Sequence, residues 1–452
     1  MRGSVMNRVW CRLATALLVT SASAGAAIAQ EKPATAPPAD DVKIITCGTL
    51  LAVPGKPPLK NATIVVRNGV IESVSEGQPP LSRRQGDVVE RIDLSDKYVL
   101  PGLIDCHVHL TGIYNETYLQ RRAVETPEFA TARATAWARL TLEAGFTTVR
   151  DLGGEAGAIL GLRDAINQGY VVGPRVIAAG KSIAVTGGHA DPTNLLRQDL
   201  VRPVDERDGV ADGADACAKA VRYQIKLGAD CIKLTATGGV LSASTAGLKQ
   251  HFTDAELASI VNVAHMMNRK VAAHAHGVDG INAALRAGVD SIEHGTYLDD
   301  ESIKLFKDKG TYLVPTMLAA WTVGENARKP GYYLRIIAEK AAAVAPINKS
   351  AVQKAHGAGV KIAFGTDTGV SEHGQNAREF ALLVDAGIPP MEAITMATVA
   401  AADLLGLSNE IGTLEKGKKA DLIAVTGDPA ADVKVLENVA VVMKEGKVAK
   451  GK

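Results

Sequence analysis

Residues 98–110 read YVLPGLIDCHVHL, a short apolar run that ends in two histidines separated by one residue. Seven similar runs follow along the chain, among segments of helical pattern: FTTVRDLG (146–153), RVIAAG (175–180), CIKLTAT (231–237), KVAAHAHG (270–277), DSIEHG (290–295), TYLVPTM (311–317) and KIAFGTD (361–367). Runs this apolar suit strands covered on both faces, and eight strand–helix units over about 300 residues match a (β/α)8 barrel. We therefore predict an α/β fold with a (β/α)8 TIM barrel at residues 98–407.

A doubly wound open sheet is the main alternative to this barrel. Five of the eight runs carry a polar residue able to bind a metal at or near the carboxyl end. A barrel gathers its active site at the carboxyl ends of its strands, so the pattern favours the barrel.

Shorter alternating strands flank the barrel segment at both ends. VKIITCGTLL (42–51) and ATIVVRNGVIESVSE (62–76, with an Asn-Gly turn) precede it, and VAVVMKEGKVA (439–449) follows it. Neither flank has many strands by itself, so we expect residues 42–97 and 408–452 to pair into one small sheet domain.

The first 29 residues have the layout of a secretory signal peptide. Three arginines precede a short apolar stretch at 13–19, and the small-residue tract SASAGAAIAQ (21–30) follows with an expected cleavage site after Ala29. Residues 30–41 are rich in Pro and Ala and predict a flexible linker. We expect a periplasmic or secreted protein whose four remaining cysteines are buried side chains, with a single disulfide left open.

Composition limits the classes of partner. With 46% hydrophobic residues the chain can bury a large core, and 50 basic against 49 acidic residues give a formal charge of +1. This balance gives no electrostatic reason to expect nucleic acid or, once the signal is cleaved, a membrane surface. We expect a small-molecule partner, and the composition leaves open whether the chain forms a homo-oligomer.

The runs carry a set of candidate metal ligands. His107 and His109 are two apart, so in a strand both side chains point to one side and could chelate one ion. Lys233 shares a strand face with Cys231 and Thr235 and would project into the barrel, either in a salt bridge or as a carbamate formed with CO₂ that bridges two metals. Single residues of these types are often structural, but their coincidence at the ends of five strands indicates a two-metal hydrolytic site: His107, His109, Lys233, His274 or His276, His294 and Asp367.

Together these motifs resemble the amidohydrolase superfamily. The segments TTVRDLGG, TGGH, IKLTATGG, AHAHG, EHG and FGTDTG are most similar to its imidazolonepropionase-like branch of metal-dependent dipeptidases and carboxypeptidases, which includes Xaa-Pro dipeptidases and hydrolases of ochratoxin-type amides. The resemblance implies a composite β-sandwich at 42–97 and 408–452 beside the barrel.

The resemblance also implies roles for individual residues. His107, His109 and Asp367 would bind the more buried of two divalent ions, with zinc expected, and His274 and His294 the second, with carboxylated Lys233 bridging both. Water activated between the metals would attack the amide, and Asp367 would be the catalytic group that carries the proton to the leaving amine. The expected substrate contacts are His189, Gly239, His276 and His373.

The resemblance implies an amide hydrolase for dipeptides or N-acyl amino acids. A cyclic-amide hydrolase or deaminase of the same superfamily is the alternative, and a non-catalytic binding protein is a third. Arg150 and Asp151 are expected to form a structural pair, with Arg150 a weaker candidate for a substrate carboxylate.

Overall fold

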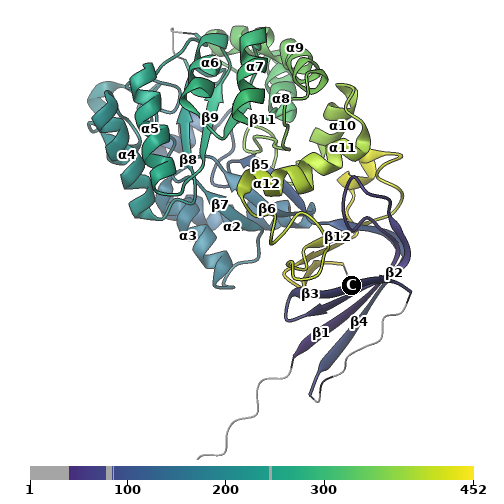
Figure 1. Ribbon diagram of the computed structural model, residues 1–452. Coiled ribbons are helices and arrows are strands. Elements are labelled where there is room, and N and C mark those ends of the chain that lie inside the picture. Colours follow the sequence, from purple (N-terminus) through teal and green to yellow (C-terminus); the bar gives the residue numbers. More distant parts are fainter. Residues whose placement is uncertain (1–39, 78–83, 85, 244–246, 452) are drawn as a thin grey trace, which may run out of the picture. The chain divides into compact units, whose positions relative to one another are not determined.

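Short parallel strands alternate with helices through the middle of the chain (Figure 1). The computed structural model describes residues 40–77, 84, 86–243 and 247–451. The first seven of the predicted runs each form a strand. One parallel sheet holds β5 (Leu103–Val108), β6 (Phe146–Asp151) and β7 (Arg175–Ala178), and a second holds β8 (Ile232–Thr235), β9 (Val271–Ala275), β10 (Ser291–His294) and β11 (Tyr312–Val314).

Single bridges join the edges of these two parallel sheets. Ile183, after β7, bridges Leu234 in β8, and Ile362 in the eighth predicted run bridges Leu313 in β11. On its other side the eighth run accepts a hydrogen bond from Cys106 N–H to the carbonyl of Phe364 (2.9 Å). The eighth run was expected to be a strand, but it is an extended segment without a continuous ladder, and Asp367 (φ +57°) turns the chain out of the strand conformation at its end.

The helices begin and end at residues suited to helix ends. Thr253 and Asp299 cap α5 and α7 with side-chain oxygens, and Gly228, Gly288 and Gly310 end α4, α6 and α7 in the left-handed conformation. The α-helices are α1 (Tyr118–Val124), α2 (Pro127–Glu143), α3 (Ala156–Asn167), α4 (Ala214–Leu227), α5 (Asp254–Met266), α6 (Val278–Ala287), α7 (Asp300–Lys309), α8 (Met317–Ala327), α9 (Arg335–Gly357), α10 (Arg378–Asp385), α11 (Pro390–Thr395) and α12 (Ala401–Leu405). Short 3₁₀ helices lie at Gln198–Leu200, Glu206–Asp208 and Val433–Glu437, and a π-helical turn lies at Met396–Ala400.

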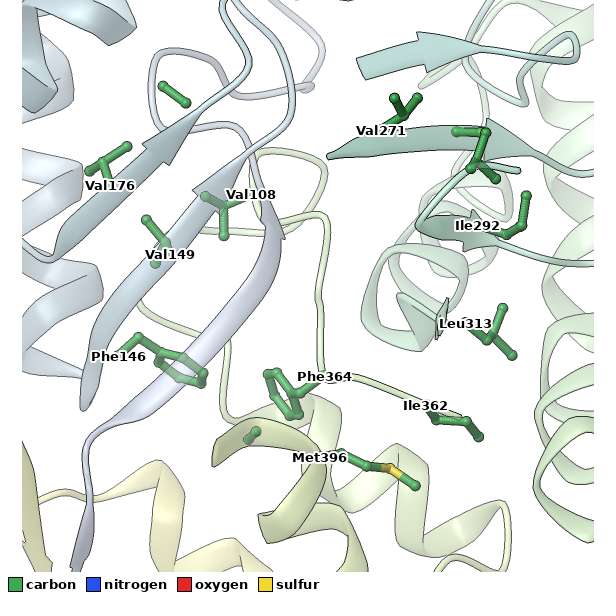
Figure 2. Packing of buried hydrophobic residues seen from close by; sticks show 14 of the residues in the cluster. Val108, Phe146, Val149, Val176, Val271, Ile292, Leu313, Ile362, Phe364 and Met396 are labelled. Atoms are coloured by element: carbon green, nitrogen blue, oxygen red, sulfur yellow. The ribbon is translucent and has the colours of Figure 1, made fainter. Parts of the chain in front are cut away.

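Successive side chains along each strand point alternately toward the main hydrophobic core and toward the candidate site. Val271, Ile292 and Leu313 lie on neighbouring strands and belong to one buried hydrophobic cluster (Figure 2). The rings of Phe146 and Phe364 stack in the same cluster with centroids 5.6 Å apart. Burying a side chain of this size contributes about 1.5–3 kcal/mol relative to exposure, so the core holds the strand ends that carry the polar residues in fixed positions.

The two flanking segments form one mixed seven-stranded sheet in the order β14-β13-β12-β4-β1-β2-β3. The two turns Asn68-Gly69 and Glu445-Gly446 both have positive φ at each residue, as tight two-residue hairpins require. The strands are β1 (Asp41–Leu50), β2 (Leu59–Arg67), β3 (Val70–Glu76), β4 (Val88–Pro101), β12 (Leu422–Val425), β13 (Val441–Lys444) and β14 (Lys447–Lys450).

This sheet joins the two ends of the described chain. β12 pairs with β4, so the C-terminal segment adds directly to the N-terminal strands. The sheet also curls back on itself, because Val70 at the start of β3 bridges Lys419 just before β12. The two flanking segments thus share one curled sheet, whose strand β4 continues to Pro101.

The predicted signal peptide at 1–29 and most of the linker at 30–41 lie outside the described residues. The last two linker residues belong to the sheet: Asp41 begins β1, and Asp40 pairs with Arg67 (2.9 Å). Within the described ranges, no helix is long and apolar enough to cross a membrane. The cysteines there are all buried free thiols: Cys47, Cys106, Cys217 and Cys231.

Candidate metal centre and active-site cavity

Two groups of side chains at the strand ends could each hold a metal ion. His107, His109 and Asp367 form one group, and His274, His276 and His294 form the other, each with its ligand atoms within 4.8 Å of one another. The rings of His107 and His294 have centroids 5.3 Å apart, so the two groups are neighbours. The structure therefore brings together all five histidines and the aspartate that the sequence put forward as ligands.

Hydrogen bonds leave one nitrogen of most of these histidines free. The Nδ1 atom of His109 lies 2.7 Å from the carbonyl of Gly153, and the Nδ1 atoms of His276 and His294 lie 2.8 and 2.7 Å from the hydroxyls of Thr296 and Thr316. Each ring then presents its Nε2 atom to the site.

Asp367 offers the oxygen donor of the first group. Its Oδ1 atom lies 3.1 Å from Nε2 of His109 and 3.5 Å from Nε2 of His107, yet this buried atom accepts no well-formed hydrogen bond within the described part of the chain. Free imidazole nitrogens beside an unsatisfied carboxylate oxygen are the donors that zinc and similar divalent ions prefer, so these residues fit a metal.

Lys233 points into the same site from β8. Its neighbours Ile232 and Leu234 face the main hydrophobic core, as the predicted alternation requires. The Nζ atom lies 3.5 Å from Nε2 of His107, and burial lowers the pKa of the lysine to about 8. Among the described residues no carboxylate forms a direct salt bridge with this amine, and the nearby charges of Glu293 and Asp367 only partly offset its burial.

Burial keeps most of the site histidines neutral. It lowers the pKa of His107 and of His276 to about 4, and that of His274 and His294 well below the ordinary value. For Asp367, burial alone would raise the pKa, but the neighbouring His107, His109 and Lys233 outweigh it and lower the pKa to about 2. Burial would also lower the pKa of His109, but Asp367 outweighs it and raises that pKa. Four neutral imidazoles therefore accompany an ionised carboxylate at neutral pH, a donor set suited to a cation.

Three side chains of the site sit on left-handed backbone. His294 (φ +73°) ends β10, Thr316 (φ +48°) lies two residues after β11, and Asp367 (φ +57°) ends the extended eighth run. Non-glycine residues rarely adopt this conformation, and such strain is concentrated at functional sites. At His294 it has a direct consequence: Glu293 and His294 are consecutive, and the turn lets both side chains reach the polar interior instead of opposite faces.

The site opens into a cavity of about 680 Å³. The metal-ligand candidates line it, and Val240, Val323 and Val344 are among its apolar lining residues. Arg122 is also in the lining, where its guanidinium is held by the carbonyls of Pro192 and Asn194. A cavity of this size accommodates a drug-sized ligand.

The four expected substrate contacts have different positions. His189 lines the cavity and its ring stacks on that of His274, with centroids 4.4 Å apart. His276 also lines it, but as a member of the second metal group. Gly239 lies against His189, because a β-carbon there would be 2.2 Å from the ring. His373 is outside the cavity lining: it stacks on Trp137 (4.4 Å) and lies 2.8 Å from the carbonyl of Gly112.

Sequence reasoning missed the polar side chains beneath the ligands. Arg150 pairs with Glu293 (2.9 Å) and not with its neighbour Asp151 as expected, and its full burial removes it from contact with a substrate carboxylate. Asp151 instead accepts hydrogen bonds from the backbone of Leu110 and Gly153. Strand alternation was the available signal, because consecutive residues in β6 face opposite ways.

Asp105 is a second missed residue. It accepts hydrogen bonds from the backbone N–H of His107 (3.0 Å) and of Thr366 (3.1 Å). Its other oxygen accepts from the Thr366 hydroxyl (2.6 Å) and the Asn376 amide (2.8 Å). This buried carboxylate therefore ties the strand that carries the histidine pair to the segment that carries Asp367.

Comparison with known proteins shows the family to which the chain belongs. The model of the Amidohydrolase family matches residues 98–449. The chain belongs to the amidohydrolase family, and with it to the hydrolases that act on amide bonds on a TIM-barrel-like α/β fold. This confirms the family predicted from the strand-end motifs.

Individual relatives cover nearly the whole chain. Ochratoxinase of Aspergillus niger is 34% identical over 93% of this chain and 90% of its own length. A solved Xaa-Pro dipeptidase with bound methionine in its active site is 42% identical, with a TM-score of 0.86 over 91% of this chain and 100% of that one. A prolidase complexed with N-methylphosphonate-L-proline is 30% identical, with a TM-score of 0.82 over the same shares of the two chains.

Proposed function

We propose that this protein is a two-metal amidohydrolase that cleaves the amide bond of dipeptides or N-acyl amino acids, in the manner of a dipeptidase or carboxypeptidase. The observation that carries the proposal is the pair of neighbouring ligand groups with Lys233 beside them, 3.5 Å from His107. Similarity to ochratoxinase, an Xaa-Pro dipeptidase and a prolidase supports amide substrates of this kind, including ochratoxin-type amides.

Different residues would bind the metal ions and transfer the proton. His107, His109 and Asp367 would hold one divalent ion, and His274 and His294 the other, with His276 beside them. Two ions bound there, which we propose to be zinc, would lower the pKa of water and polarise the scissile carbonyl. Asp367, ionised at neutral pH, takes the proton from the attacking water and delivers it to the leaving amine, which is a poor leaving group without that proton.

Carboxylation of Lys233 would complete the site. A buried ammonium at this position has Glu293 and Asp367 nearby but no direct salt bridge among the described residues, and its Nζ atom lies 3.5 Å from the Nε2 atom of His107. The lowered pKa leaves an appreciable fraction of the amine neutral near neutral pH. The nitrogen lone pair of a neutral amine forms an N–C bond to CO₂ while one C=O bond opens, and one N–H proton passes to solvent. The resulting carbamate is an anion with two oxygens and would bridge both ions.

The cavity supports a substrate with an apolar part. Val240, Val323 and Val344 come from the loop after β8 and from helices α8 and α9, and line the cavity in one hydrophobic cluster. The volume of about 680 Å³ exceeds what two small residues fill. We therefore propose that an apolar side chain or acyl group occupies this wall during cleavage.

The architecture and location form part of the proposal. We propose that the bridges at Ile183 and Ile362, with the hydrogen bond from Cys106 to Phe364, close the two parallel sheets and the extended eighth run into a (β/α)8 barrel. The arginines and small-residue tract of residues 1–29 support export and cleavage near Ala29, giving a periplasmic or secreted enzyme.

A substrate screen tests the reaction. Purified protein is incubated with dipeptides and N-acyl amino acids that vary in the C-terminal residue, and amine release is measured. Hydrolysis of several members, fastest for apolar ones, is expected. Turnover of hydantoins or aminated heterocycles, with no amine release from the linear amides, would contradict the proposal and favour the cyclic-amide hydrolase or deaminase.

A pair of lysine variants tests the carbamate. Lys233→Ala should lose the second metal and most activity. Lys444→Met is the matched control, because the pKa of Lys444 on β13 is also lowered by burial, but this lysine lies in the flanking sheet beside Glu445 and outside both metal groups. Elemental analysis should find full metal content in the control. Full metal content and activity in Lys233→Ala would exclude the bridge.

A further inference from the structure

We propose that Arg150 and Glu293 are positioning residues that act through His107: they hold the imidazole proton on Nδ1 and aim the lone pair of Nε2 into the first metal group. The inference rests on the proposed two-metal function. Neither residue reaches the cavity, so neither can touch substrate directly. Their side chains are fully buried beneath the site.

Arg150 is fixed by three separate contacts. From β6, its Nε atom donates to the carbonyl of Cys106 (2.7 Å), Nη1 to the hydroxyl of Ser291 (3.2 Å) and Nη2 to Oε1 of Glu293 (2.9 Å). The planar guanidinium thus links β6 to β5 on one side and to β10 on the other. The Cys106 carbonyl belongs to the residue just before His107, so the same cation holds both the backbone and, through Glu293, the side chain of that ligand.

Glu293 divides its two oxygens between the arginine and the histidine. Oε1 accepts from Arg150 and also from the Ser291 hydroxyl (2.5 Å), while Oε2 lies 2.9 Å from Nδ1 of His107. An ionised carboxylate can only accept hydrogen bonds, so Nδ1 must carry the proton and Nε2 must be the bare nitrogen. A metal ligand requires this tautomer, and a carboxylate behind a histidine makes the ring a stronger ligand.

His107 is distinguished from the other site histidines by this charge. Among the described members of the two metal groups, it is the one whose Nδ1 faces a carboxylate, whereas Nδ1 of His109 faces a carbonyl and those of His276 and His294 face hydroxyls. The carboxylate support is therefore concentrated on one ligand of the first group.

Strand β10 serves both metal groups. Glu293 supports a ligand of the first group, and the next residue, His294, belongs to the second. The left-handed backbone at His294 is what allows both consecutive side chains to point inward. The geometry thus predicts that disturbing Glu293 weakens the first site while leaving the donor atoms of the second in place.

The test measures metal affinity without reference to activity. Apo-protein is titrated with Zn²⁺ in competition with a chromophoric chelator, for the wild type, Glu293→Gln and Ser291→Ala. Wild type should bind two ions. Glu293→Gln should bind one of them about 10–100-fold more weakly, the usual effect of losing a partner behind a metal-bound histidine. Ser291→Ala, which keeps the carboxylate, should weaken the same site less.

Two further variants separate a positioning role of Glu293 from an effect on the folding stability of the protein. Glu293→Gln leaves a buried guanidinium without its anion and could prevent folding, so the double variant Arg150→Met/Glu293→Gln, which removes both charges, carries the test in that case. Asp421→Asn breaks an ion pair with Arg175 (2.9 Å) that lies outside both metal groups, and should lower thermal stability without changing either affinity.

The Co²⁺-loaded proteins give an independent signature of ligand geometry. The visible absorption bands of the Glu293 variants should shift relative to wild type, and those of Asp421→Asn should not. Wild-type zinc affinities and cobalt bands in the folded Glu293 variants would overturn the positioning role. A wild-type protein that binds no metal would instead refute the proposed function, so the two failures are distinguishable.

Discussion

Replacement of Gly239 by alanine should disturb the site through a single steric contact. A β-carbon at this position would lie 2.2 Å from Cε1 and 2.3 Å from Nδ1 of His189. Normal contacts between such atoms are about 3.5–4.0 Å, so the His189 ring must retreat by about 1 Å or more. That ring stacks on His274 and lines the cavity, so the displacement reaches both substrate and a metal ligand.

The expected losses of stability and of rate follow from the steric overlap between the added β-carbon and the His189 ring. Overpacking of a well-packed site costs about 1–3 kcal/mol of stability, and a misplacement of about 1 Å can lower the rate about 100-fold. Chemical denaturation and kcat/KM for a cleaved amide measure the two effects. Gly157→Ala in α3 is the control, because a β-carbon there meets nothing within 4 Å and should be neutral or stabilising. Wild-type stability and kcat/KM in Gly239→Ala would refute the steric argument.

Three further changes have distinct expected outcomes. Asp367→Asn should abolish turnover while leaving substrate binding measurable by calorimetry, since the proton carrier is lost but the cavity is not; retained turnover would contradict its role. Val323→Trp should reduce cavity volume and raise KM for substrates with large apolar groups more than for small ones, and a uniform change would contradict the proposed apolar wall. Burial raises the pKa of Glu379 to about 8, above its ordinary 4.5, so the folded protein retains a proton that the unfolded chain releases and stability falls as pH rises between about 5 and 8. Glu379→Gln, whose single amide oxygen can still accept one of the two backbone N–H groups of Met317 and Leu318, should reduce this fall in denaturation curves, and an identical pH slope would contradict it.

The sequence predicted the parts of the site that follow from strand periodicity. Lys233 faces the site and its neighbours Ile232 and Leu234 face the core, as alternation in a short buried strand requires. His107 and His109 likewise meet Asp367 from the far end of the barrel segment. Parallel strands of similar length place their carboxyl ends together, so these residues could be grouped without coordinates.

What the sequence did not predict depends on backbone conformation and long-range pairing. Simple alternation would separate Glu293 from His294, and only the positive φ of His294 turns both inward. Arg150 finds its partner 143 residues away instead of next to it in the chain. His373 follows Asp367 closely in sequence, but its loop carries the ring to Trp137 and away from the cavity lining.

The fold, like the site, was predicted in some parts and not in others. The hairpin at Asn68-Gly69 was predicted because both residues tolerate positive φ. The eighth run, by contrast, has the composition of a strand but forms one isolated bridge, at Ile362, and the chain turns out of the extended conformation at Asp367. The strand propensity of a sequence does not indicate where the hydrogen bonds between neighbouring strands stop.

Metal content and amide hydrolysis measured on the same sample test the central claim most directly. Purified protein is analysed for transition metals, stripped with a chelator, assayed for amine release, and assayed again after Zn²⁺ is restored. The account predicts about two ions per chain, loss of activity on stripping and recovery on restoration. A protein that is fully active without metal would contradict it.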